Sequence, residues 1–223
     1  MSPLDLILVI DGSQIGKHNA TLMISLVWIG RGIPLCWLTK QGGKGHFKTE
    51  DHFKLLKEVV ELIVPLVDGK TQVTVLGDGE FDSIELQELC LSANWNYVFR
   101  TAKDTVFFED AERFQPKQIA PDKTTDALMI PQVAFSNKQF KWVNLVIWYN
   151  PKHDEAIPLI SNIDDLGEVK RLYAKRYSIE CLFKDLKSIS FNIHKTRLKK
   201  PEQVSKIILI TSLAFLLLTL LAL

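Results

Sequence analysis

The sequence predicts an α/β protein in which a mixed β-sheet is flanked by helices. Three observations predict this class. Short apolar runs alternate with amphipathic helical patterns over the first hundred residues. Acidic residues, Asp11 and Asp78, follow two of the apolar runs. The 223 residues are 47% hydrophobic and 24% charged, which is typical of a globular chain long enough for one sizeable core.

Three strands are expected at the start of the chain. Residues 4–10 form an apolar run that ends at Asp11, and residues 20–30 and 33–39 form two more. The short Gly-Arg-Gly turn at 30–32 predicts that the last two make an antiparallel hairpin. An Asp at the carboxyl end of a central strand points into the crevice where α/β sheets bind ligands, but an ordinary Asp-Gly turn explains Asp11 equally well.

A helix is expected next, over residues 49–66. Thr49 can cap its start, and the acidic residues 50 and 51 suit the positive end of the helix dipole. Apolar residues recur at helical spacing and predict one buried face. That face consists of Phe53, Leu56, Val60 and Ile63.

The next strand, helix and strand complete the first hundred residues. Residues 72–76 are rich in β-branched side chains and lead into Asp78. A helix then begins at Asp82, which has a glutamate three residues later as in a capping box. Residues 97–100 form another short strand.

This order of elements is that of a ribonuclease-H-like fold. In such a sheet the first and fourth strands are parallel neighbours, so we expect Asp11 and Asp78 to meet, with an acid on a later helix completing a metal cluster. The predicted organisation has three parts: the first part of the core at 1–100, a small β-rich insertion at 101–165, and the catalytic helix with a C-terminal core helix at 166–223.

Four polar side chains of the stretch 173–187 fall on one stripe if the stretch is a single helix. They span about a sixth of the helix circumference. They are Tyr173, Arg176, Glu180 and Lys187. A carboxylate there can hold a metal ion, and the cations and phenol can hold phosphate oxygens beside it. The alternative is a solvated face on which Arg176 and Glu180, four residues apart, pair with each other.

Basic residues gather in the same part of the chain. The net charge of the whole chain is only +1, but residues 168–206 carry 11 Lys or Arg and 4 Asp or Glu, a net charge of +7. They include a basic loop at 193–200 that contains Lys195 and Arg197. This segregation fits a polyanion such as DNA, although a charged solvated surface would show it too.

The spacing of these residues resembles a known signature. Tyr173, Arg176, Glu180 and Lys187 match, in type and spacing, the Tyr-Arg-Glu-Lys signature of bacterial insertion-sequence transposases of the DDE class, the Insertion Sequence Four group. The resemblance implies that Glu180 is the third catalytic carboxylate, with Asp11 and Asp78 as the other two. It also implies a β insertion before the Glu helix.

The resemblance implies a cofactor and partners. The three acids would hold two Mg²⁺ ions, which Mn²⁺ can replace, for nicking and strand transfer. The substrate would be double-stranded DNA, both transposon terminal inverted repeats and target, bound by a homodimer. The expected DNA-binding residues are Tyr173, Arg176, Lys184, Lys187, Arg100, Lys195 and Arg197.

Tryptophans of the insertion have two readings. Residues 142–149 and 156–160 are expected as strands. Family members are thought to stack a flipped base on an aromatic from this region, which would suit Trp142 or Trp148. Strand tryptophans are more often core, and we expect core for both.

Two departures from the family pattern lead to a narrower expectation. Gly79 follows the second Asp where members often carry Arg, and the first strand begins at residue 4, where members usually have a helical DNA-binding region. We therefore expect the catalytic domain alone, from a degraded or split reading frame. Alternatives are a ribonuclease-H-like nuclease without strand transfer, and an inactive remnant that binds DNA or inhibits a full-length transposase.

The C-terminal run raises a third alternative, a membrane tether. Residues 207–223 contain no charge and are just long enough to span a bilayer. We expect instead a buried helix under the sheet, in a chain that stops early. Three widely separated cysteines and the absence of a signal-peptide pattern favour a reducing cytoplasm. The resemblance implies that this is the bacterial cytoplasm, near the nucleoid.

Overall fold

Strands β1 (Asp5–Ile15), β2 (Asn19–Trp28) and β3 (Arg31–Gln41) form an antiparallel meander. The structure, a computed structural model, describes residues 5–43, 47–121, 126–149 and 155–221. The chain divides into unit 1, residues 1–71 and 175–223, and unit 2, residues 72–174. The meander belongs to unit 1.

The first strand is longer than predicted. It continues through Asp11 to Ile15, and Asp11 lies opposite Met23 of β2. The expectation that Asp11 ends its strand is therefore wrong. The reason is that β2 offers hydrogen-bonding partners along its whole length, so the Asp-Gly pair is held in the ladder and does not turn.

Helix α1 (Thr49–Ile63) continues into a 3₁₀ turn, Val64–Leu66. Its cap is Lys48, whose backbone N–H donates to the Asp51 carboxylate at 3.1 Å, so Thr49 is not the cap as expected. The buried face is also turned from the predicted one. It consists of His52, Leu55, Leu56, Val59 and Ile63.

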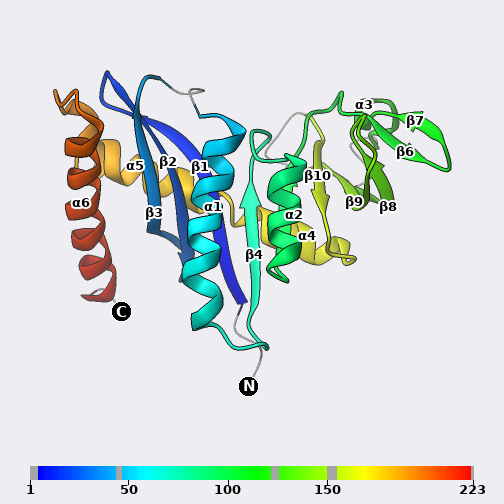
Figure 1. Ribbon diagram of the computed structural model, residues 1–223, viewed down its shortest axis with the longest axis horizontal. Coiled ribbons are helices and arrows are strands. Elements are labelled where there is room, and N and C mark those ends of the chain that lie inside the picture. Colours follow the sequence, from blue (N-terminus) through cyan, green and yellow to red (C-terminus); the bar gives the residue numbers. More distant parts are fainter. Residues whose placement is uncertain (1–4, 44–46, 122–125, 150–154, 222–223) are drawn as a thin grey trace. The chain divides into compact units, whose positions relative to one another are not determined.

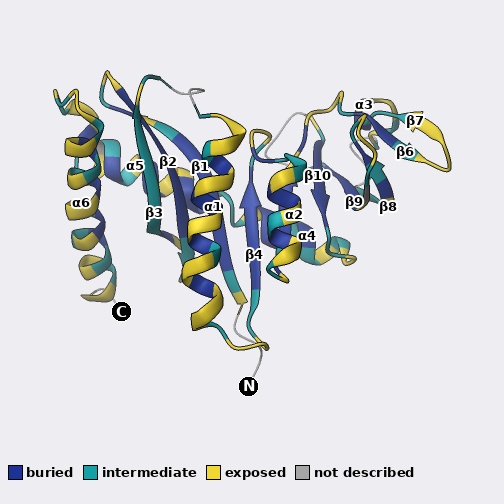
Figure 2. Cartoon of the chain, viewed as in Figure 1, coloured by how far each residue is buried: buried dark blue, intermediate teal, exposed yellow. Residues whose placement is uncertain are grey.

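Two further helices complete unit 1. Helix α5 (Tyr177–Lys184) runs into a π-helical turn, Asp185–Ile189, and a 3₁₀ turn, Ile193–Lys195, before α6 (Pro201–Leu221). Helix α1 lies on one face of the meander and α5 on the other, and α6 lies beside β3 (Figure 1). The residues buried between these layers, dark blue in Figure 2, are mostly apolar.

Unit 2 is built on a second set of strands. Strand β4 (Gln72–Gly77) pairs parallel with β5 (Asn96–Arg100), and β5 pairs antiparallel with β10 (Ile157–Ser161). The remaining strands continue antiparallel from β10 in the order β9 (Phe140–Trp148), β8 (Ala127–Phe135), β6 (Phe107–Glu109) and β7 (Glu112–Phe114). Of the strands after β5, β10 is thus hydrogen-bonded to a strand of the predicted core, and the others follow from β10 in the same sheet.

Three helices accompany this sheet. They are α2 (Ile84–Ser92), α3 (Pro116–Ile119) and α4 (Leu166–Ala174). Helices α2 and α4 both pack against β5. The fold class is therefore confirmed: the protein is α/β, with mixed sheet strands flanked by helices and the ribonuclease-H-like order of elements.

Helix α2 begins differently from the prediction. Its cap is Ser83, whose hydroxyl accepts from the backbone N–H of Leu86 at 3.4 Å. The carboxylate of Asp82, the predicted cap, accepts a hydrogen bond from the Thr101 hydroxyl instead.

The two tryptophans of β9 have opposite surroundings. Trp148 is 8% exposed and belongs to the core, as expected. Trp142 is 65% exposed and has a positive φ of 65°. The core prediction is wrong for Trp142 because register shifts between β8 and β9 interrupt the regular alternation of side chains at this end of the hairpin.

Helix α6 is buried on one side only. Val204, Ile208, Ser212 and Phe215 face inward, but large apolar residues on the other side are exposed. The helix is long and apolar enough to span a membrane, and 22% of its most apolar window is buried. The expectation of a buried helix is therefore wrong for most of its circumference.

Candidate active site

Asp78 lies directly after β4 and lines a cavity of about 490 Å³ within unit 2. Its Oδ1 atom accepts a hydrogen bond of 3.0 Å from the backbone N–H of Glu80, which fixes the carboxylate in the turn. The cavity is lined by Asp78, Gly79, Glu80, Arg100, Thr101, Ala102, Lys103, Asp104, Glu155, Ala156 and Pro158. Two predicted site residues, Asp78 and Arg100, therefore share one cavity.

The sequence did not point to Lys103 in this cavity. Lys103 lies three residues after Arg100 and pairs with the exposed carboxylate of Glu155 at 3.0 Å. The signal that could have found it is its position just beyond the carboxyl end of β5, the parallel neighbour of β4. With Arg100 it brings two cations to the cavity that contains Asp78.

Asp82 stabilises the same region through a hydrogen bond to Thr101, which lines the cavity. Its carboxylate accepts a hydrogen bond of 2.6 Å from the Thr101 hydroxyl, and the hydroxyls of Thr101 and Thr105 are 2.9 Å apart. Burial raises the pKa of Asp82, the Thr101 hydrogen bond opposes this, and the nearby Asp78 carboxylate raises it further. The bond ties the segment after β4 to the segment after β5.

Asp11 lies in unit 1, in the middle of β1, and is 8% exposed. Its Oδ1 atom accepts from the backbone N–H of Gly12 at 2.7 Å. The neighbours before it in the strand, from Leu8 to Ile10, are completely buried. Asp11 is therefore a nearly buried carboxylate on a strand that α5 also contacts.

The predicted single helix through residues 173–187 is interrupted. Helix α4 ends at Ala174, residues 175 and 176 form a turn, and α5 begins at Tyr177. Tyr173 lies in α4 of unit 2 and is 7% exposed. The four signature residues therefore do not form one stripe on one continuous helix, and that prediction is wrong.

Glu180 lies in the first turn of α5 and Arg176 caps it. The Arg176 guanidinium is bonded to the Glu180 carboxylate, as the i, i+4 spacing predicts. The Glu180 side chain is 42% exposed and that of Arg176 is 19% exposed. The pair therefore reaches solvent, where both a metal ion and a phosphate can approach.

The apolar anchors of α5 and of the π-helical turn after it are those that the sequence predicts. Ile179, Leu182, Phe183 and Leu186 are all buried. Gly32 of β3 allows α5 to approach closely, because a Cβ atom there would lie 3.1 Å from the Ser178 carbonyl oxygen. These contacts therefore define the position of the helix that carries Glu180 against β3.

Lys187 lies in the π-helical turn after α5. Its ammonium is 5.8 Å from the centroid of the Phe183 ring, which is a cation–π distance. The turn ends with a hydrogen bond of 3.0 Å from the Ser190 N–H to the Asp185 carbonyl oxygen, five residues earlier. Single π turns of this kind occur often at functional sites. Lys184 is exposed at the end of α5.

The basic loop is exposed but anchored. Lys195 and Arg197 are exposed, and between them the Thr196 methyl lies against Gly16 of the turn after β1. The Asn19 side chain donates to the Leu198 carbonyl oxygen at 3.2 Å. The loop therefore presents its cations from a fixed position on unit 1.

The predicted metal ligands divide between the two units. Asp11 and Glu180 lie in unit 1 and Asp78 in unit 2. Within the described residues, no three His, Cys, Asp or Glu side chains already form a metal-binding group. The donor set is nevertheless suitable, because carboxylate oxygens are the ligands that Mg²⁺ and Mn²⁺ prefer.

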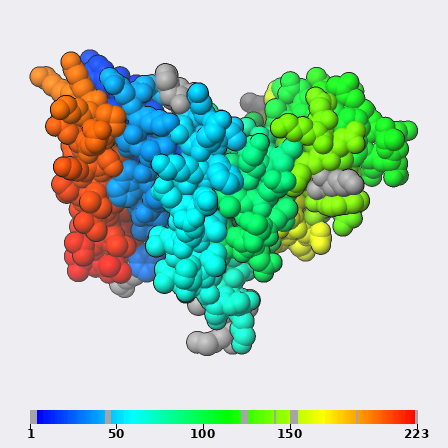
Figure 3. Space-filling view, in the orientation of Figure 1, coloured from blue at the N-terminus to red at the C-terminus, as the bar shows by residue number. Residues whose placement is uncertain are grey.

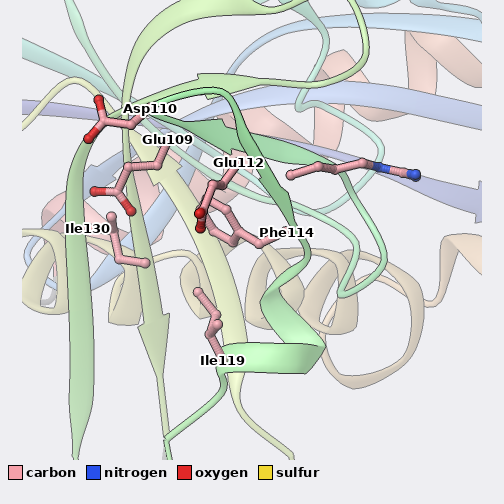
Figure 4. A pocket seen from close by; sticks show the side chains of 7 residues that line it. Glu109, Asp110, Glu112, Phe114, Ile119 and Ile130 are labelled. Atoms are coloured by element: carbon pink, nitrogen blue, oxygen red, sulfur yellow. The ribbon is translucent and has the colours of Figure 1, made fainter.

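A second cavity of unit 2 does not suit DNA. It measures about 480 Å³ and lies against the β6–β7 hairpin, where Glu109, Asp110 and Glu112 surround it (Figure 4). Arg113 is the basic residue among its lining. Three acids against one base repel phosphate, so we do not assign it to substrate binding.

The family comparison includes Asp78 and Glu180. The family described as transposase DDE domain matches residues 45–217, more than half of the chain. The chain belongs to this family. Asp11 lies before the matched residues of the transposase DDE domain. Membership indicates an enzyme with nuclease or transposase activity, and the family generally uses divalent metal ions. No curated protein matches the chain.

Solved structures offer weaker likenesses. Endonuclease V of Ciona intestinalis, in complex with a 24mer DNA containing an inosine followed by a ribo-adenosine, is 14% identical, with a TM-score of 0.47 over 85% of this chain and 89% of that one. The catalytic domain of human Endonuclease V is 10% identical, with a TM-score of 0.40 over 98% and 85%. The NurA nuclease of Sulfolobus solfataricus is 11% identical, with a TM-score of 0.33 over 80% and 74%. None of these likenesses assigns a function.

Proposed function

We propose that this chain is the catalytic domain of an insertion-sequence transposase of the Insertion Sequence Four group. It would nick DNA at the ends of the element and join the freed strand to a target. The observation that carries the proposal is the placing of Asp78 and Arg100 in one cavity, inside the residues that match the transposase DDE domain.

Asp11, Asp78 and Glu180 would hold two divalent ions, Mg²⁺ or Mn²⁺. Such ions supply stabilisation of the attacking and leaving oxygens of a phosphodiester. The attacking oxygen belongs to water in the nicking step and to the freed 3′ hydroxyl in strand transfer. Arg176 would keep the Glu180 carboxylate oriented before DNA binds, since the two side chains are already bonded.

The cations would position the DNA backbone. Arg100 and Lys103 line the Asp78 cavity, and each can bind a phosphate oxygen there. Lys195 and Arg197 on the anchored loop, with Lys184 and Lys187, would hold phosphates beside unit 1. Tyr173 is nearly buried, so its part would be to support α4 more than to contact DNA.

Trp142 is a further candidate for contact with DNA. A tryptophan that is 65% exposed at the end of a β-hairpin can stack on an unpaired base. Stacking of this kind would hold a base that leaves the duplex during cleavage.

The test is the product of the purified chain acting on its own element's ends. The substrate is labelled duplex DNA from the flanks of the reading frame, with a target plasmid and Mg²⁺ or Mn²⁺. Joined donor and target strands are expected. Nicks without joining would favour the ribonuclease-H-like nuclease, and no metal-dependent product with any DNA would favour the inactive remnant.

In this proposal two copies of the chain form a homodimer that holds a pair of DNA ends. The protein would act in the bacterial cytoplasm. A complex that contains two chains and two DNA ends, measured by light scattering, would support it.

A further inference from the structure

Helix α6 has a second apolar face that the described chain leaves uncovered. Its inner face packs against β3, where the Trp37 indole donates to the Ser205 hydroxyl at 2.9 Å. The outer face exposes seven large apolar side chains. They are Leu209 48%, Ile210 66%, Leu213 55%, Leu217 60%, Leu218 60%, Leu220 49% and Leu221 84%. The yellow bands of α6 in Figure 2 mark this face.

The exposed residues follow the spacing of a helix-pairing seam. Ile210, Leu213, Leu217 and Leu220 are separated by three, four and three residues. This is the a and d pattern of two consecutive heptads, with Ile at the first a position and Leu at both d positions. Such a pattern fits another apolar helix and favours a pair of helices.

The size of the patch suits a stable contact. In the space-filling view, side chains of α6 lie at the surface along the length of the helix (Figure 3). Seven side chains, each about half exposed or more, amount to several hundred Å², at the upper end of what monomers expose and near the ~800 Å² that each partner of a stable complex buries. A second α6 supplies a matching apolar surface of the same length.

A groove adjoins the seam within unit 1. It measures about 350 Å³, and Ile29, Phe215 and Leu218 form apolar parts of its wall. Ile29 is itself 62% exposed, at the turn between β2 and β3. The groove provides a hole for an apolar side chain from a neighbouring helix.

A membrane fits this face less well. Open sheet edges do not occur in the hydrocarbon layer of a bilayer, but the inner face of α6 packs against β3, the last strand at one edge of its sheet. A helix that lies on a membrane surface carries Lys or Arg along its polar side, and α6 has no charged residue from Ile207 to Leu221. A protein surface is the better partner.

We propose that the α6 seam, defined as Ile210, Leu213, Leu217 and Leu220, is a contact between two copies of this chain. A twofold axis would bring the two seams together, so that each copy contributes the same surface. The contact would form without DNA and does not depend on the transposase activity proposed above.

The experiment measures mass in solution. The full chain is studied by sedimentation equilibrium and light scattering over a range of micromolar concentrations, without DNA. The test variant is Leu213→Glu with Leu217→Glu. The matched control is Leu62→Glu with Leu66→Glu, two exposed leucines of unit 1 outside the seam, 54% and 77% exposed. Circular dichroism checks that each variant is folded.

We expect a dimer for the parent and the control, and a dissociation constant raised by roughly 100-fold or more for the seam variant. If that variant fails to fold, Leu213→Ala with Leu217→Ala should still weaken the dimer. A parent that is monomeric throughout, a dimer that both double variants weaken equally, or a monomer that binds anionic lipid vesicles through the seam would each overturn the proposal. A parent that is dimeric but does not cleave DNA from its element's ends with Mg²⁺ or Mn²⁺ would instead contradict the proposed function and leave the seam intact.

Discussion

The Thr101 hydroxyl donates a hydrogen bond of 2.6 Å to the Asp82 carboxylate, next to the cavity that contains Asp78. Thr101 is 1% exposed, and Asp82 is a half-buried acid whose pKa is raised, first by burial. The bond links the turn after β4 with the end of β5. It therefore supports the two chain segments that carry Asp78 and Arg100.

A first prediction concerns stability against pH for Asp82→Asn. Because the folded protein holds the Asp82 proton more tightly than the unfolded chain does, this group favours folding below its ordinary pKa of 3.8. That advantage is lost as the pH rises through the raised pKa. The parent should therefore lose stability relative to Asp82→Asn over this interval, measured as free energies of unfolding in urea.

The control for that experiment is Asp68→Asn, for which the sign is opposite. Hydrogen bonds from the Thr71 hydroxyl and from the backbone N–H groups of Lys70 and Thr71 lower the pKa of Asp68. Its contribution is present above 3.8 and disappears as the pH falls through the lowered pKa. If both variants changed the pH profile in the same direction, the assignment for Asp82 would be wrong.

A second prediction concerns Gly32. In Gly32→Ala the new methyl would lie 3.1 Å from the Ser178 carbonyl oxygen, 3.3 Å from the Ser25 hydroxyl and 3.4 Å from the Leu182 Cβ atom. Overpacking of this kind costs about 1–3 kcal/mol of unfolding free energy. Because α5 must shift, Mg²⁺-dependent cleavage should also fall. Gly69→Ala meets nothing within 4 Å and should leave both unchanged.

A third prediction concerns the basic loop. Replacing Lys195 and Arg197 by Gln should weaken DNA binding and lower the slope of log K against log salt by about 0.9 for each phosphate that the loop no longer neutralises. Fluorescence anisotropy at several salt concentrations measures this. The control is Lys54→Gln with Lys57→Gln, two exposed cations of α1. An equal reduction of the slope in both proteins would show that the loop has no special part.

A fourth prediction separates the two tryptophans of β9. Trp148→Ala should lower the unfolding free energy by about 3–5 kcal/mol, because the indole is buried. Trp142→Ala should leave stability almost unchanged but weaken binding of DNA ends with an unpaired base, where stacking contributes about 1–3 kcal/mol. Unaltered binding by Trp142→Ala would remove Trp142 from the DNA-binding surface.

The sequence was sufficient for the order of elements because that order depends on local patterns. Apolar runs bounded by turn residues became β1 to β5, and helical periodicity predicted the buried anchors of α5, such as Ile179 and Leu182. The pairing of strands could not be predicted as well, because it depends on residues far apart in the sequence. Nothing local indicates that β2 holds the Asp11-Gly12 pair in the ladder.

The candidate site was predicted only in part. A helical wheel assumes an unbroken helix, and neither Pro nor Gly marks the turn at Lys175 and Arg176. No sequence pattern marks the π turn that contains Lys187 either. The i, i+4 pair of Arg176 and Glu180 was predictable because it lies within one helical repeat.

The exposed face of α6 shows another limit of pattern reading. An uncharged run is compatible with a core helix, a membrane span or a protein contact, since all three bury apolar surface. The four buried positions from Val204 to Phe215 became distinguishable from the outer leucines only through the position of β3.

The most direct test of the central claim is the cleavage rate of Glu180→Gln with Mg²⁺ and DNA from the element's ends. The matched control is Glu168→Gln, since Glu168 is also a partly exposed helical glutamate paired with an arginine, Arg171. We predict that Glu180→Gln lowers the cleavage rate by at least about 1000-fold with an unchanged melting temperature, while Glu168→Gln cleaves at the parent's rate. Cleavage at the parent's rate by Glu180→Gln would contradict the assignment.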